Sequence, residues 1–424
     1  MKSECRLALA ACVLLLFAFN TVTDAQDMEM DHSMSADTVP KFHGGASGIL
    51  FGNRQSPSIG NRTLTEGYLS QPMLMGTAEF PRYGIELGGT LNFEGLTLER
   101  GELNPGISGE GYIDRRHPHT YLHEMVGTWT RQVGTNARFS ITAGKGFAPF
   151  GTDDPMVRPF VKYPLNHHLA QILERAIVLG AVSYGPIAAE LARFNGDEPE
   201  SPSDFPNSSR LFDSWAGRLT AHIKDVAEIQ GSFASVVSPE VAAGGGLDQK
   251  KWSASARYES GAYYGLAEFA HTQELESNRD AFAFQTMLAE GSVTRNAFSF
   301  SARAERTERP EEERTADPFR TPRPESDLSI LGRTQWTVLT ANLSREFVVS
   351  KVRLTPFAEV ARAHAKSLDR FPVFDPRTFY GSDVLWSLSA GFRFGVGMMH
   401  HRMGRYGAAL PAGAMNMGDM DMGQ

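Results

Sequence analysis

Three histidines lie within seven residues of the chain, and each of their rings offers nitrogen atoms that can bind a metal ion. His117, His119 and His123 occur in GYIDRRHPHTYLHEMVGTW, with Met125 two residues further on. In an extended chain these side chains project to one side, and alternate ones lie about 7 Å apart. Imidazole and thioether donors without thiolate favour copper, and imidazoles alone also suit zinc or nickel. The alternative is a polar wall whose histidines hydrogen-bond to carboxylates and arginines.

A second pair of histidines, His167 and His168, lies in the stretch VKYPLNHHLAQILERA. The spacing of its leucines and isoleucine is partly helical, although we expect the stretch to belong to a long connection over about 148–175. Such a connection can fold inward and narrow a pore. We expect it to bring His167 or His168 close to the first three histidines.

The two ends of the chain hold most of its methionines, and histidines accompany them. The residues concerned are Met28, Met30, His32 and Met34 at one end, and Met398, Met399, His400, His401, Met403, Met415, Met417, Met420 and Met422 at the other. Methionine usually packs in a core, but these residues lie among Asp, Gly, Ser and Asn. Soft thioethers favour Cu(I), and the histidines add a capacity for Cu(II), so we predict copper as the ligand. The alternatives are a low-complexity tail without a ligand and a scavenger of oxidants.

The start of the chain has the layout of a secretory signal peptide over residues 1–25. The apolar run Leu7–Phe19 is shorter than the roughly 20 residues that a membrane helix needs. We expect the mature chain to begin near Gln26. Cys5 and Cys12 are the two cysteines of the chain, so the exported protein would have neither a disulfide nor a thiolate metal site.

Apolar and polar residues alternate with a period of two through most of the chain, which predicts β-strands with one apolar face. In AFSFSARAE, Phe298 and Phe300 fall on one face, whereas Arg303 and Glu305 fall on the other. Fifteen segments of this kind can be recognised, and SGILFGN at Ser47–Asn53 offers a sixteenth.

Short turns such as YGP and ESGA alternate with long polar connections, for instance 95–118 and 307–332. This pattern is typical of outer-membrane barrels, whose strands have dyads of about ten residues. We therefore predict an all-β, antiparallel, up-and-down transmembrane β-barrel of about 14–16 strands. A soluble β-sandwich or propeller is the alternative, but charges recur on the face opposite the aromatic residues, where a sandwich would not need them.

The chain divides into a signal peptide (1–25), a Met/His segment (26–45), the barrel (46–397) and a Met/His tail (398–424). We expect both Met/His segments to be disordered and to lie in the periplasm, with the barrel in the bacterial outer membrane and in contact with its lipid. The net charge of −8 argues against a nucleic-acid partner.

Three classes of function fit these features. The first is a barrel that binds copper and helps in copper resistance or in copper transport across the outer membrane. The second is a general porin for small solutes, in which the methionines have no metal role. The third, an outer-membrane hydrolase, needs a histidine beside a nucleophile; His222 and His271 are available, but neither has a recognisable nucleophile motif near it, so we do not expect an enzyme.

The stretches DRRHPHTYLHEMVGTW (Asp114–Trp129) and FVKYPLNHHLAQILERAIVLGAVSYG (Phe160–Gly185) resemble those of a known family. It consists of uncharacterised outer-membrane barrel proteins that accompany copper-resistance determinants and carry a DRQHPHD-type signature. The resemblance covers about residues 70–200 of this sequence. The Met/His ends are similar to those of copper-resistance outer-membrane proteins of the CopB type. The resemblance implies a role in copper handling, and periplasmic copper-handling proteins as partners.

The sequence departs from the family pattern in two places. Thr120 stands where the pattern has Asp, which removes a carboxylate that could bind or orient a metal. The chain also continues for 28 residues after Val396, whereas outer-membrane barrels usually end on an aromatic strand.

Overall fold

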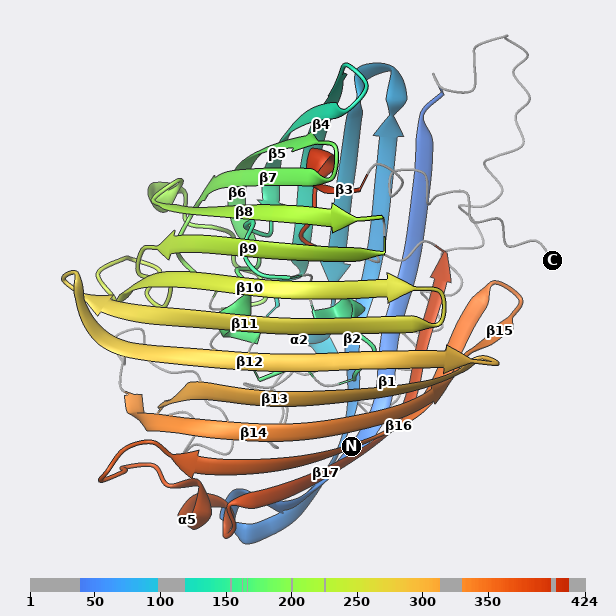
Figure 1. Ribbon diagram of the computed structural model, residues 1–424. Coiled ribbons are helices and arrows are strands. Elements are labelled where there is room, and N and C mark those ends of the chain that lie inside the picture. The colour runs from blue at the N-terminus through green and yellow to red at the C-terminus, as the bar shows by residue number, and fades with distance from the viewer. Residues whose placement is uncertain are drawn as a thin grey trace.

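The structure is a computed structural model, which describes residues 39–97, 119–152, 155–161, 163–165, 167–199, 201–224, 226–312, 330–397 and 402–411. Within these ranges seventeen strands form one antiparallel sheet that closes on itself (Figure 1). The same ranges contain no helix long and apolar enough to cross a membrane.

The strands are β1 (Lys41–Ser58), β2 (Arg62–Phe80), β3 (Ile85–Asn92), β4 (Leu122–Val133), β5 (Ala137–Gly146), β6 (Arg175–Tyr184), β7 (Ile187–Phe194), β8 (Ser214–Ile223), β9 (Ala227–Val236), β10 (Asp248–Ser260), β11 (Tyr263–Glu276), β12 (Arg279–Arg295), β13 (Phe298–Glu312), β14 (Ile330–Arg345), β15 (Phe347–Val349), β16 (Val352–Ser367) and β17 (Val384–Gly397). The helices are α2 (Glu94–Thr97), α3 (His167–Ala170) and α5 (Pro376–Tyr380), with short 3₁₀ turns at η4 (Ile59–Asn61), η5 (Pro81–Tyr83), η6 (Pro155–Val157), η7 (Ser208–Arg210) and η8 (Gly407–Ala409).

Each strand pairs with the next one in the sequence, and the first strand pairs with the last. β1 and β17 are in register from Gly45 opposite Gly397 to Ser56 opposite Trp386. β15 continues β14 after a break at Glu346, and both segments pair with β16. Counting β14 and β15 as one strand, the described wall has sixteen strands. A closed ring leaves no unpaired edge, which is what a sheet in lipid requires. The predicted antiparallel barrel of about 14–16 strands is confirmed.

The predicted alternation of faces is present in the wall. On β13, Phe300 is 55% exposed on the outside, whereas Arg303 is 3% exposed and faces the interior. On β17, Trp386 and Leu388 point outward, while the intervening Ser387 is buried. The outer surface is therefore an apolar band that contacts lipid, and the inner surface carries the polar and charged side chains.

The connections are short at one end of the barrel and mostly long at the other. β12 and β13 are joined by Asn296 and Ala297, both at positive φ, and β6 and β7 by Gly185 and Pro186. Tight two-residue turns of this kind match the twist of antiparallel strands. At the opposite end the described connections are mostly longer, for example 237–247 and 368–383. The short exceptions there are the 3₁₀ turn η4 between β1 and β2 and the two-residue turn at Ser277 and Asn278 between β11 and β12. We call these ends the short-turn end and the long-loop end.

β4 contains an irregularity beside its first histidines. Thr90 of β3 pairs with Glu124, but the next residue, Leu91, pairs with Leu122. His123 is thus an extra residue in a β-bulge, with both His123 and Glu124 buried. A bulge of this kind reverses the in-and-out phase of the strand that follows it.

The reversed phase corrects one sequence prediction. Met125 was expected to project to the same side of the strand as His123. Instead Met125 is 58% exposed on the outside, and Val126 and Thr128 are buried inside the barrel. The prediction was wrong because unbroken alternation was assumed through the position of the bulge.

Candidate functional site in the barrel interior

The described residues of the connection between β5 and β6 (147–152, 155–161, 163–165 and 167–174) lie inside the barrel, so this connection does fold inward. We call it the inward loop. Its backbone is held by charged side chains of the opposite wall: Leu165 N donates to Glu305 Oε2 at 2.8 Å, and Val161 N donates to Glu359 Oε2 at 3.0 Å. These contacts carry the loop across the interior from β5 to β13 and β16.

The charges that hold the loop are buried and paired. Arg158 of the loop lies 3.5 Å from Glu268 and 3.8 Å from Glu290 on the wall. Arg303 pairs with Glu305 at 2.8 Å and lies over the ring of Phe160, 4.5 Å from its centroid. Buried ions are stable only with such partners, so these pairs set the position of the loop.

The beginning of the inward loop is fixed at Gly151. Its carbonyl accepts from Arg218 Nη1 at 3.1 Å and from Gln230 Nε2 at 2.8 Å, and its N–H donates to Ser232 Oγ at 2.9 Å. Gly151 has φ +70°, and a Cβ there would lie 1.6 Å from the carbonyl oxygen of Ala170. A glycine is therefore required where the start of the loop passes the end of its own helix α3.

A second segment, residues 402–411, also lies inside the barrel; we call it the terminal segment. In Figure 1 its 3₁₀ turn, η8, appears in red within the wall, beside β5 and β7. Arg402 Nη2 lies 2.9 Å from Glu228 Oε1, and Arg405 Nη1 donates to Thr220 Oγ1 at 3.0 Å and lies 3.6 Å from Glu190 Oε2. Burial, together with the nearby charge of Arg218, lowers the pKa of Arg405 to about 10, so it still carries its charge at neutral pH.

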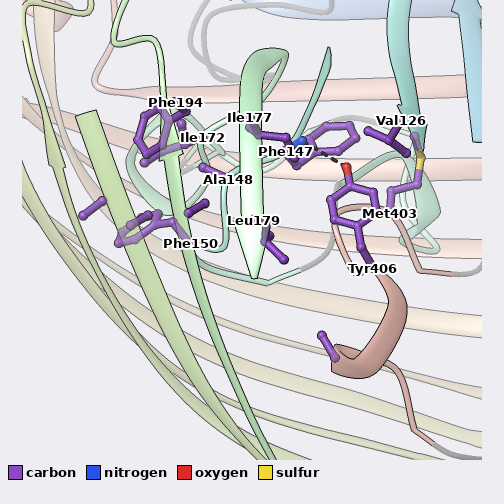
Figure 2. Packing of buried hydrophobic residues seen from close by; sticks show 14 of the residues in the cluster. Val126, Phe147, Ala148, Phe150, Ile172, Ile177, Leu179, Phe194, Met403 and Tyr406 are labelled. Atoms are coloured by element: carbon purple, nitrogen blue, oxygen red, sulfur yellow. Dashed lines mark hydrogen bonds between the residues drawn. The ribbon is translucent and has the colours of Figure 1, made fainter. Parts of the chain in front are cut away.

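Tyr406 joins the terminal segment to the inward loop. Its hydroxyl donates to Glu124 Oε1 at 2.6 Å and accepts from Phe147 N at 3.0 Å, the bond drawn in Figure 2. Burial, and then the charge of Glu124, raise the pKa of Tyr406 well above its usual value, so the hydroxyl remains a neutral donor.

Apolar packing holds the terminal segment as well. Met403 is 3% exposed and lies with Val126 and Phe147 in the interior cluster seen in Figure 2. We predicted Met403 as a copper ligand in a disordered tail. The structure places it in this core, because residues 402–411 have wall partners for both arginines and for the tyrosine.

Two histidines of the opening motif meet at the long-loop end of the barrel. The centroids of the His119 and His123 rings are 5.2 Å apart, and both side chains are buried. His119 Nδ1 lies 3.0 Å from Glu94 Oε2, and Glu94 Oε1 accepts from Ser70 Oγ and Gln71 N at 2.7 Å each. Ser70 and Gln71 therefore hold the carboxylate of Glu94 in place, and this carboxylate orients the ring of His119.

His123 has the same relationship to another carboxylate. Its Nδ1 makes a short contact with Glu174 Oε1, while Glu174 Oε2 accepts from Thr120 N at 3.0 Å and from Thr120 Oγ1 at 2.7 Å. Lys145 Nζ lies 3.7 Å from the same carboxylate. Burial alone would raise the pKa of Glu174, but the charge and hydrogen bond of His123, and then the charge of Lys145, lower it to about 2.

The other predicted ligands are only partly placed. His117 lies outside the described residues, as do Met28, Met30, His32, Met34, Met398, Met399, His400, His401, Met415, Met417, Met420 and Met422. The backbone of His167 and His168 forms α3, which lies against β11 and β12, while their side chains are outside the described part of the structure. Among the residues that are described, no group of three or more His, Cys, Asp or Glu side chains is arranged to hold a metal ion.

Sequence reasoning missed the partners of these histidines. Glu94 follows β3, and Glu174 precedes β6, so neither lies near the motif in the sequence, and their convergence follows from strand pairing. Thr120 stands where the family pattern has Asp, and its hydroxyl donates to Glu174. A carboxylate therefore lies beside the histidines although the Asp itself is missing. The sequence of the terminal segment does differ from that of the tail beyond it. RMGRYGAALP contains one methionine and no Asp, which indicates that it need not share the structure of the tail.

Comparison with solved structures agrees with this architecture. The chain is similar to an anion-selective porin from Comamonas acidovorans, with a TM-score of 0.50 and 8% identity over 85% of this chain and 100% of that one. It is also similar to OmpT, an outer-membrane protein of Vibrio cholerae, with a TM-score of 0.49 and 9% identity over 84% and 99% of the two chains. No protein-family model and no curated protein matches the sequence.

The protein is thus a porin-like β-barrel of the outer-membrane type: the closed sixteen-stranded wall, its apolar exterior and the first of these likenesses define that class of fold. The resemblance to barrels of copper-resistance loci finds no support in the comparisons and stays a prediction.

Proposed function

We propose that the protein is an outer-membrane channel that lets small hydrophilic solutes diffuse across the barrel. A closed wall with an apolar exterior needs no other structure to span the membrane. Its interior carries both signs of charge, for example Glu190 and Arg218 paired at 2.6 Å, and Glu268 beside Arg158 at 3.5 Å. Such an interior suits water and polar solutes.

The observation that carries this proposal is the anchoring of the inward loop. Its contacts with Glu305 and Glu359 hold it against the wall opposite to the strand from which it leaves. A loop fixed in this way divides the interior and sets the width of the path that remains. In this proposal the inward loop is the constriction of the channel.

The test is conductance of the full-length protein in planar bilayers, together with swelling of proteoliposomes in sugars of increasing size. We expect discrete conductance steps and a size limit, both absent from protein-free bilayers and after heat denaturation. Conductance no higher than that of the protein-free bilayer would exclude a channel.

Copper binding is the second candidate, and the pairing of each histidine with a carboxylate supports it. Glu94 and Glu174 hold the Nδ1 atoms of His119 and His123, the arrangement that orients imidazoles which bind metals through Nε2. Copper would be bound there either as a resident ion or as an ion in transit through the barrel. A periplasmic copper-handling protein would then be a fitting partner. In this second proposal the signal peptide exports the chain, and both Met/His ends lie in the periplasm, where they also bind copper.

A Cu(I) titration against a competing chelator tests copper binding on the full chain. We expect the His119→Ala/His123→Ala variant to lose one class of sites, and a variant with its Met/His ends deleted to lose others. Met125→Ala is the matched control, because this side chain faces outward and should not change the titration. Absence of Cu(I) binding in the unaltered protein would exclude a copper role.

A further inference from the structure

The terminal segment occupies the interior without being part of the wall. β17 ends at Gly397 at the short-turn end, and the barrel is already closed there by its pairing with β1. Residues 402–411 then contact β4, β5, β6 and β7 from within, mainly through side chains. Removing the segment therefore leaves all described strand pairs intact.

The contacts of the terminal segment complement those of the inward loop. The loop reaches the half of the wall formed by β11 to β17, for instance Glu268 and Glu359. The terminal segment binds the other half, through Glu124 on β4, Ser140 on β5 and Glu228 on β9. The two meet at the bond between Phe147 N and Tyr406 Oη, so together they extend from one side of the interior to the other.

The charges of the segment and the wall are of opposite sign. RMGRYGAALP contains two arginines and no acidic residue. Arg405 lies 3.6 Å from Glu190 and 3.4 Å from Glu228, which also binds Arg402. On the wall around them, Arg218 pairs with Glu190, Arg138 donates to the carbonyl of Leu410, and His222 lies 3.8 Å from Glu228.

We propose that residues 402–411 are an internal plug of the channel, and that the barrel without them is wider and selects cations. This inference rests on the proposed channel function and deepens it. Withdrawal of the segment removes two positive charges. Glu190 keeps its pair with Arg218, but Glu228 loses Arg402 and Arg405, and Glu124 loses the hydroxyl of Tyr406, so the carboxylates of Glu124 and Glu228 then face the interior. Carboxylates that line a narrow pore favour the passage of cations.

Truncation after Gly397 is the first test, measured beside the full-length protein in planar bilayers. We expect the truncated barrel to conduct at least about twofold more, and its reversal potential in a KCl gradient to move towards that of K⁺. Folding of the truncated form is checked by its resistance to unfolding in SDS without heating.

A reversible lock tests the same plug in the full chain. Cys5→Ser and Cys12→Ser remove both native cysteines, and Ser140→Cys with Ala408→Cys places two thiols where Ala408 N donates to Ser140 Oγ at 2.9 Å. We expect oxidation to suppress channel opening and a reductant to restore it. The control is a pair within the wall, Thr286→Cys and Thr307→Cys, whose hydroxyl oxygens are 2.7 Å apart and far in sequence from the plug. This pair should form its disulfide without changing conductance.

The outcomes separate the two proposals. Higher conductance after truncation, together with suppression by the Ser140→Cys/Ala408→Cys disulfide, supports the plug. Equal conductance and ion selectivity of the full-length and truncated proteins overturn the plug and leave the channel standing. If neither protein conducts although both are folded, the channel itself is excluded, and the plug with it.

Discussion

His123 and Met125 are two residues apart on β4 but lie on opposite sides of the barrel wall. His123 is fully buried against Glu174, and Met125 is 58% exposed to the lipid side. The bulge at His123 reverses the alternation, so that odd-numbered residues after it point to the outside of the wall. The histidine is thus part of a buried ionic cluster, whereas the methionine is part of the outer band.

This relationship predicts different costs for two alanine substitutions. His123→Ala leaves the charge of Glu174 buried without its histidine and should lower the free energy of unfolding by about 3–5 kcal/mol. Met125→Ala should cost less than about 1 kcal/mol, because the side chain is not packed in the interior. Urea unfolding in lipid vesicles measures both. Adding Glu174→Gln to His123→Ala should recover part of the loss; equal costs for the two single substitutions would contradict the placement.

The low pKa of Glu174 predicts how its contribution depends on pH. A carboxylate with a folded-state pKa of about 2 and an ordinary value of 4.5 stabilises the fold above pH 4.5. This contribution is lost as the pH falls from 4.5 to about 2, and amounts to about 3 kcal/mol. The measurement is the difference in unfolding free energy between the wild type and Glu174→Gln across this range. A difference that stays constant with pH would argue against the ion pair with His123.

Removing one anchor of the inward loop should loosen it. Glu359 accepts from Val161 N and also from Asn342 Nδ2 at 3.0 Å, so Glu359→Ala leaves a buried loop amide without its acceptor. The cost should be about 1–3 kcal/mol. We expect faster tryptic cleavage after Lys162, the residue next to Val161, and a broader distribution of conductance. Glu308→Ala is the matched control, since Glu308 bonds to Gln285 on the outside of β13; a similar effect there would show that the loop is not held by Glu359.

The outer band predicts a penalty for charge at its centre. Leu219 lies near the middle of β8 and is 57% exposed. Leu219→Arg should destabilise the barrel by about 2–4 kcal/mol if the position lies at the bilayer midplane, because the guanidinium would sit in hydrocarbon. Leu219→Phe is the control and should be nearly neutral. Unfolding in vesicles measures both, and an unchanged stability of Leu219→Arg would mean that this face of β8 does not meet lipid.

Much of the wall can be predicted from the sequence, because each strand repeats a simple pattern. Alternation on β13 and β17 placed Phe300 and Trp386 outside and Arg303 inside, and the structure agrees. The strand at Ser47–Asn53 was the weakest of these patterns, yet it belongs to β1, which closes the ring with β17. The sequence offered this stretch as a sixteenth strand, and a wall of sixteen strands agrees with the even number that is usual for such barrels.

The interior was less predictable, because it depends on contacts between residues far apart in the sequence. Nothing near His119 indicates that Glu94 will orient it. The one sign of the bulge at His123 is that Glu124 falls on the same face as Leu122 and Val126 in an unbroken alternation. Tyr406 lies between methionine-rich stretches, which led to the prediction of a disordered metal-binding tail. Its partners, Glu124 and Phe147, come together with it only in the closed barrel.

The terminal segment also has a consequence for the order of assembly. Tyr406 and Glu124 are 282 positions apart in the chain, and residues 402–411 follow the last strand. Their site is formed by β4 to β9 and enclosed by the pairing of β1 with β17. A wall in which β4 to β9 have skipped a strand or slipped in register does not present Glu124, Glu190 and Glu228 together. Docking of the segment therefore requires these six strands to be correctly paired.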